Sequence, residues 1–192
     1  MVGDERAYSY FSSRKGDTLA DEALKASLIG LSNVKTYSWL NMFSDERQYC
    51  SPGVNLPVCT FSRSLNYPEY HTHKDNFDVV TQKGLEGSFE IFKKIVDAME
   101  LGLYPKSTVF GEPNLGKRNL YPTISKKVKP TEQISKADEA LKASQNIGQL
   151  KRNFIACSDG MTNIFKIAEL LSSPLDKLCN EYSVLKSKKV LK

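Results

Sequence analysis

The segment from Leu85 to Leu101 constrains the fold of this chain more than any other part of its sequence. Large apolar residues recur there, and just beyond it, at intervals of three and four, while charged residues occupy the opposite face. The apolar positions are Leu85, Phe89, Phe92, Ile95, Val96, Met99 and Leu103. This is the period of an amphipathic α-helix, whose apolar stripe has to be buried against another element. We therefore expect a core-facing helix that carries no chemistry of its own.

Shorter patterns upstream predict a helix and two strands. Residues 17–29 have helical spacing of leucine and alanine, Thr18 or the residue before it can cap the start, and Gly30 ends the helix. Residues 34–40 and 54–61 are rich in β-branched and aromatic side chains and are bounded by turn formers, so we expect strands there. Helices and strands in this order indicate an α/β unit.

The C-terminal part of the chain has a pattern of its own. Residues 153–157 suggest a short strand, and two helices are expected on either side of the Ser172-Ser173-Pro174 turn. Two short helices joined by a tight turn and followed by a basic tail resemble a winged helix-turn-helix. The proline-rich stretch 104–130 precedes this unit, and we place the boundary within it, which predicts domains over residues 1–125 and 126–192.

The net charge of +5 is unevenly distributed. Residues 1–115 hold 12 Lys and Arg against 15 Asp and Glu, about −3, whereas residues 116–192 hold 15 against 7, about +8. A basic C-terminal part can be a solvated surface or can meet nucleic acid or an acidic partner. Its last helix lacks arginine and glutamine, which most often read base edges, so we expect no sequence-specific DNA recognition.

Composition excludes several other classes of protein. The sequence contains no apolar stretch near the roughly 18 residues that a membrane span needs, and its first residues lack the apolar core of a signal peptide. The four cysteines stand far apart, which indicates reduced thiols rather than a disulfide framework. We therefore expect a cytoplasmic protein with no membrane partner.

Candidate chemistry lies between Ser44 and Asp78. Both histidines of the chain, His71 and His73, occur in the polar segment YPEYHTHKDNFD, among several carboxylates. Histidine with nearby carboxylates suits zinc, but a zinc site needs three or four ligands. From composition alone, two surface histidines in a polar turn are the favoured interpretation.

Longer motifs carry a resemblance to a known family. The segments SDERQYCSPG, LPV, YPEYHT, KDNFD, GEPNLGKRNLYP and a later SDG resemble a bacterial aminopeptidase-like family. That family has been described as a domain of unknown function and is related to the co-catalytic zinc aminopeptidases and to glutaminyl cyclases. The resemblance runs from Ser12 to the end of the chain. It implies part of an α/β zinc-aminopeptidase-like sandwich, a mixed sheet with helices, followed by the winged helix-turn-helix.

The resemblance also implies roles for individual residues. His71, in the Tyr-His-Thr motif, matches the family's last zinc ligand, and His73 departs from the family pattern and is an extra ligand or nothing. Asp45 matches an acidic residue beside the site, and Glu46 and Arg47 are expected on the substrate side, where a peptide-like substrate would bind. Zinc in such enzymes polarises the scissile carbonyl and acidifies its bound water.

The family's earlier zinc ligands and its glutamate base have no counterpart in this sequence. We therefore expect zinc binding by this chain to be weak or absent. Three hypotheses follow. In the first, the chain is half of a zinc aminopeptidase-like protein that is inactive alone and is completed by an upstream half or by a homo-oligomer. In the second, it is a module that binds nucleic acid or protein through the basic winged helix, and in the third it is a self-sufficient hydrolase. The site of the third would consist of His71, His73, Asp75 and Glu46.

Overall fold

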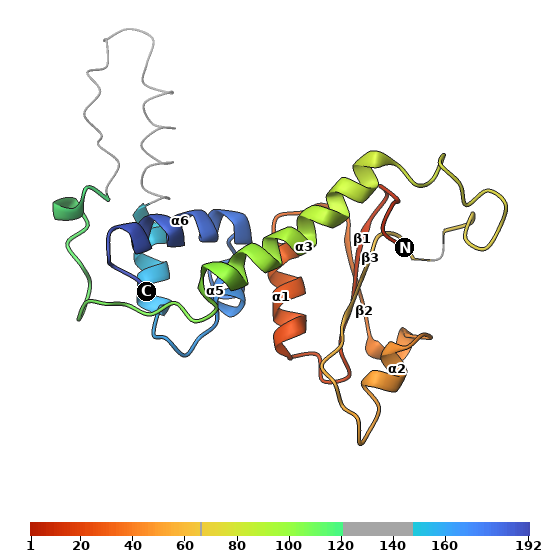
Figure 1. The fold of residues 1–192 in the computed structure, drawn as a ribbon, viewed down its shortest axis with the longest axis horizontal. Helices are drawn as coiled ribbons and strands as arrows, with labels where there is room; N and C mark the ends of the chain where they lie inside the picture. Colours follow the sequence, from red (N-terminus) through yellow and green to blue (C-terminus); the bar gives the residue numbers. More distant parts are fainter. Residues whose placement is uncertain (66, 121–147) are drawn as a thin grey trace, which may run out of the picture.

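The N-terminal part of the chain is built on a small mixed sheet. The computed structural model describes residues 1–65, 67–120 and 148–192. Strands β1 (Tyr8–Phe11), β2 (Val34–Tyr37) and β3 (Thr60–Ser62) lie in the order β2-β1-β3 (Figure 1). The pair β1–β2 is parallel and the pair β1–β3 is antiparallel. The expected mixed sheet is confirmed, although only the end of the segment 54–61 belongs to a strand.

Two helices cover one face of this sheet. In α1 (Leu19–Leu28), Leu24 and Leu28 pack against Tyr10 of the central strand, and Ile91 of α3 (Gln82–Gly102) joins the same cluster. Thr18 caps α1 through a reciprocal pair of hydrogen bonds with Asp21, as the sequence predicts for a helix that begins here. Two short helical turns complete this part: η1 (Trp39–Asn41) and α2 (Glu46–Tyr49). A third turn, η2 (Gly116–Arg118), lies beside the C-terminal helices (Figure 1).

The C-terminal part is helical. Residues 148–157 form a helix, followed by α5 (Ile164–Leu170) and α6 (Leu175–Ser187). The strand predicted for residues 153–157 is wrong, because the residues buried here, among them Phe154 and Ile155, recur at helical spacing and pack into the core. The ring of Phe154 meets that of Tyr182 edge to face, with centroids 5.6 Å apart.

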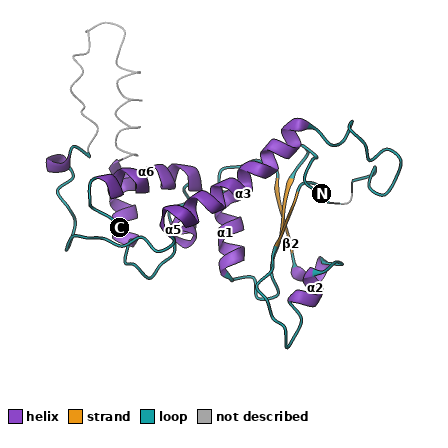
Figure 2. Cartoon of the chain, viewed as in Figure 1, coloured by secondary structure: helices purple, strands orange, loops and turns teal. Residues whose placement is uncertain are grey.

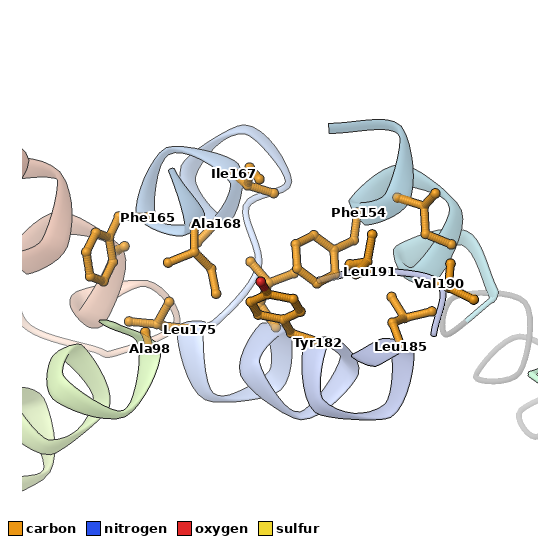
Figure 3. Close-up of a cluster of buried hydrophobic side chains, with 14 of the residues drawn as sticks. Ala98, Phe154, Phe165, Ile167, Ala168, Leu175, Tyr182, Leu185, Val190 and Leu191 are labelled. Carbon is orange, nitrogen blue, oxygen red and sulfur yellow. The ribbon is translucent and has the colours of Figure 1, made fainter. Parts of the chain in front are cut away.

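One hydrophobic core joins the two parts. Ala23 and Ala26 of α1 and Ala98 of α3 lie in the same buried cluster as Phe165 of α5 and Tyr182 of α6 (Figure 3). In Figure 1, α3 crosses from the sheet to the C-terminal helices, and residues 106 and 107 form bridges to Asp159 and Leu191. The expected boundary between residues 125 and 126 lies outside the described residues.

The orientation of α3 differs from the prediction. Its buried positions are mostly small, Gly84, Ser88, Ile91 and Ala98, and its large apolar positions are about half exposed or more: Leu85, Phe89, Phe92, Val96 and Met99. The reason is close packing, because a Cβ atom at Gly84 would lie 1.8 Å from the carbonyl oxygen of Gly3. The expectation that the large stripe faces the core of this chain is therefore only partly met: Ile95 and Leu103 pack against the core, whereas the other five residues are about half exposed or more. Over the described ranges, we find no helix with the length and apolar character needed to cross a membrane.

Candidate functional site

The residues singled out from the sequence fall into two separate segments. Asp45, Glu46 and Arg47 belong to the α2 segment, which precedes β3, whereas the histidine loop, residues 67–78, follows β3. The two segments lie at opposite ends of that strand (Figure 1). The histidine loop contains neither helix nor strand (Figure 2). The candidate residues within each segment therefore lie close together, but the structure does not place the α2 segment against the histidine loop.

Hydrogen bonds and ring contacts hold the side chains of the α2 segment. The Thr60 hydroxyl donates to Oε1 of Glu46 at 2.7 Å, while Oε2 of the same carboxylate is buried and has no hydrogen-bond partner among the described residues. The guanidinium of Arg47 lies 4.9 Å from the ring centroid of Trp39 and donates to the carbonyl of Met42. Asp45 makes no capping hydrogen bond and is exposed.

Two cysteines, Cys50 and Cys59, follow α2 in the sequence. The buried thiol of Cys50 contacts the carbonyl oxygens of Leu56 and Val58 at 3.3 and 3.2 Å, which ties the turn after α2 to the start of β3. Burial, with a smaller contribution from the charge of Asp21, raises the pKa of Cys59 to about 12. This thiol stays protonated at neutral pH and is a poor nucleophile.

The stem of the histidine loop is fixed by the residues that precede β1. Arg6 forms ion pairs with Asp4 and with Glu69, the latter at 3.2 Å, and its guanidinium lies 5.2 Å from the ring centroid of Tyr67. The hydroxyl of Tyr67 donates to Asp75 at 3.0 Å. Desolvation, followed by this hydrogen bond, raises the pKa of Tyr67 to about 12. Sequence reasoning missed Arg6, because 63 residues separate it from Glu69.

His71 is exposed at the tip of this loop. Its backbone has a φ of 60°, in the left-handed region that few non-glycine residues adopt, and its ring centroid lies 3.9 Å from that of Tyr70. His73 is also exposed. Across the described ranges, no group of three or more His, Cys, Asp or Glu side chains is placed to hold a metal ion. The residues present therefore do not fit a complete zinc site.

The C-terminal end of α3 contacts α6, the last helix of the C-terminal part. The ammonium group of Lys186 donates to the backbone carbonyl of Leu101 at 2.6 Å. A Cβ atom at Gly102, where φ is +145°, would lie 2.6 Å from the hydroxyl of Tyr182, so the two helices approach closely here. Lys177 and Lys188 remain exposed.

Comparison with known families agrees with this two-part architecture. A family described as a domain of unknown function (DUF4910) matches residues 1–102, more than half of the chain. The chain belongs to this family. A second family, described as winged helix-turn-helix, matches residues 103–192 of this DUF4910 member, and the match begins where α3 ends.

Two longer proteins resemble this DUF4910 chain. A Clostridium acetobutylicum protein named "Putative polysaccharide biosynthesis protein with aminopeptidase-like domain" is 34% identical over 130 residues, which cover 64% of this chain and 29% of that protein. A crystal structure of a "putative peptidase" from the same organism covers 100% of this chain and 40% of its own, with a TM-score of 0.69 and 22% identity, and shows a shared fold. The chain spans less than half the length of either protein. Both names support a relationship to peptidase-like proteins.

Proposed function

We propose that this chain is the C-terminal part of a zinc-dependent aminopeptidase-like hydrolase and does not hydrolyse peptides by itself. It contributes the histidine loop, in which His71 is one zinc ligand, and the α2 segment, whose Glu46 and Arg47 lie on the side of a peptide-like substrate. The remaining ligands and the general base would come from polypeptide that corresponds to the rest of the longer relatives. No catalytic step is assigned to the residues described.

The observation that carries this proposal is the set of contacts that the residues of the histidine loop make. Its stem is held by Arg6, and the carboxylates beside His71 are already engaged, Glu69 with Arg6 and Asp75 with Tyr67. One positioned histidine with occupied neighbours can complete a metal site but cannot form one, because zinc in proteins takes three or four protein ligands. The peptidase-like names of the two longer proteins support the class of reaction.

Zinc binding and hydrolysis test the proposal. The purified chain, titrated with zinc and assayed on chromogenic amino-acid amides, should bind zinc weakly and show no aminopeptidase activity. Sub-micromolar, stoichiometric zinc that is lost in His71→Ala would contradict the proposal and favour a self-sufficient site around His71, in which Glu46 could take part only after a rearrangement, because the structure places it at the other end of β3. The matched control is His73→Ala, which should leave any weak zinc affinity within about twofold of the parent, whereas His71→Ala should abolish it.

The winged helix-turn-helix supports a second candidate function. The described C-terminal residues expose lysines, including Lys177 and Lys188, so sequence-indifferent association with nucleic acid or binding of an acidic protein is compatible with this surface. The contact between Lys186 and Leu101 argues against a recognition helix that inserts fully into a major groove. We therefore rank this function second.

A further inference from the structure

The large apolar stripe of α3 is about half exposed or more among the residues that the structure describes. It comprises Leu85, Phe89, Phe92, Val96 and Met99, and we refer to these residues as the α3 stripe. Phe89 is 65% exposed and the others are between 46% and 51% exposed. Their spacing of four, three, four and three residues places them on one side of a helix that is 21 residues long. Contiguous apolar surface of this kind marks an interaction site.

The side of α3 next to the stripe already has its partners. Ser88 donates to the carbonyl of Val2 at 2.5 Å, Ile91 packs in the cluster over the sheet, and Ala98 lies in the shared core. One residue of the stripe also makes a ring contact with the sheet: Phe92 meets Phe61 edge to face at a centroid distance of 5.5 Å. The helix therefore has one small-residue face packed on this chain and one large-residue face directed outward.

Both longer proteins contain polypeptide that this chain does not match. The solved structure shares the fold of this whole chain and has additional polypeptide, since the matched region is 40% of its length. The aminopeptidase-like relative is also much longer than this chain, since the 130 matched residues are 29% of it. The sheet of this chain is also short: among the described strands, β2 pairs with β1 alone, and Val34, Lys35 and Thr36 of β2 are exposed. A helix with an exposed apolar face and a sheet with an exposed edge strand are typical of one part of a larger α/β layer.

We propose that the α3 stripe binds an α/β polypeptide equivalent to the segment of the longer relatives that this chain does not match. The partner presents an aliphatic and aromatic face to Phe89 and Phe92, in the way that the layers of an α/β domain pack. The inference rests on the proposed function for the identity of the partner, but the contact itself requires no metal.

The test mixes the purified chain with the part of the Clostridium acetobutylicum relative that lies outside the matched region. Size-exclusion chromatography with light scattering should give the mass of a one-to-one complex, and hydrogen exchange of α3 should slow within it. The double variant Phe89→Glu/Phe92→Glu should weaken binding at least about tenfold, because two large apolar side chains lose their buried contacts. Lys93→Gln, on the polar face of the same helix, should bind like the parent.

Other outcomes overturn the inference. No complex, or a complex that tolerates Phe89→Glu/Phe92→Glu, means that the stripe does not bind this partner. A homodimer of the chain alone that the double variant dissociates assigns the stripe to a second copy. Zinc and activity assays on the complex of the parent chain separate the two proposals: a stripe-dependent complex that neither binds zinc nor hydrolyses amides contradicts the proposed function and leaves the docking surface standing. Zinc-dependent hydrolysis by a complex whose formation does not depend on the α3 stripe would support the proposed function and overturn the docking surface.

Discussion

The hydroxyl of Tyr10, on the central strand, donates to the carboxylate of Asp21, at the start of α1, at a distance of 2.6 Å. Asp21 is fully buried and also accepts hydrogen bonds from the backbone and hydroxyl of Ser13 and from Thr18. The carboxylate thereby joins the end of β1 to the first turn of the helix that covers it. This network fixes the layer against which α3 and the C-terminal helices pack.

Replacing Asp21 should destabilise the whole chain. Asp21→Asn keeps the volume but removes a charged acceptor and places an amide NH₂ group among donors, so we expect a loss of about 3 kcal/mol in the free energy of unfolding. Urea denaturation followed by circular dichroism measures this loss. Asp17→Asn, at an exposed position four residues earlier, is the control and should unfold at the parent's midpoint. Equal midpoints for both variants would contradict the assigned role.

Acid should weaken the same network. Burial alone would raise the pKa of Asp21, but the hydrogen bonds from Ser13, Thr18 and Tyr10 outweigh it and lower the pKa to about 2. Because the folded pKa lies below the ordinary value of 3.8, the contribution of up to about 2 kcal/mol is fully present above pH 4 and is lost as the pH falls from about 4 to about 2. Denaturation midpoints measured across this range should converge for the parent and Asp21→Asn. A constant difference between them would contradict this assignment.

Arg6 should control the order of the histidine loop. Arg6→Ala removes the ion pair with Glu69 and the contact with the ring of Tyr67, so amide exchange in residues 67–78 should rise several-fold while α1 keeps its protection. Hydrogen exchange with mass spectrometry measures both segments in one experiment. Arg14→Ala, which removes an exposed hydrogen bond to Asn55, is the matched control. Unchanged exchange in the loop would show that its stem is held by other contacts.

A buried ion pair links the helix of residues 148–157 to α6. Lys151 and Glu181 lie 2.8 Å apart, with side chains that are 10% and 15% exposed. Lys151→Met leaves the carboxylate without its partner, and we expect a loss of about 3 kcal/mol, part of which Lys151→Met/Glu181→Gln should recover. Thermal unfolding measures both effects. Lys166→Met breaks the exposed pair with Glu169 and should change stability by no more than about 0.5 kcal/mol, so a similar loss in both single variants would refute the distinction.

Nucleic-acid binding by the C-terminal part should be electrostatic and indifferent to sequence. DNA affinity, measured by fluorescence anisotropy, should fall steeply with salt, and Lys188→Ala should reduce the slope of log affinity against log salt by about 1. Lys186→Ala should leave the slope nearly unchanged, because this ammonium group is bound to the carbonyl of Leu101. A footprint on one defined sequence that survives rising salt would contradict this expectation.

Local signals in the sequence were sufficient for several elements. The Thr18 cap and Gly30 bound α1 because capping and chain reversal depend on residues within a few positions of each other. The winged helix-turn-helix was also predictable, since its pattern is continuous in sequence. The mixed sheet was expected from the family resemblance alone, and its central strand, Tyr8–Phe11, was not predicted from the sequence pattern. The prediction of a strand at residues 153–157 is wrong because a short apolar run is compatible with both the strand period and the helix period. Only the burial of Lys151, Phe154 and Ser158 selects the helix period.

The sequence by itself determined which residues of α3 are apolar, whereas the tertiary structure decided which of them face this chain. Helical periodicity gives the spacing of Leu85, Phe89 and Phe92 but not the direction of the stripe. That direction depends on Gly84 and Ser88, which let residues 1–4 approach so closely that the helix turns its small face inward. The attachment of the histidine loop to Arg6 is likewise tertiary, because residues far apart in sequence meet only after the sheet has formed.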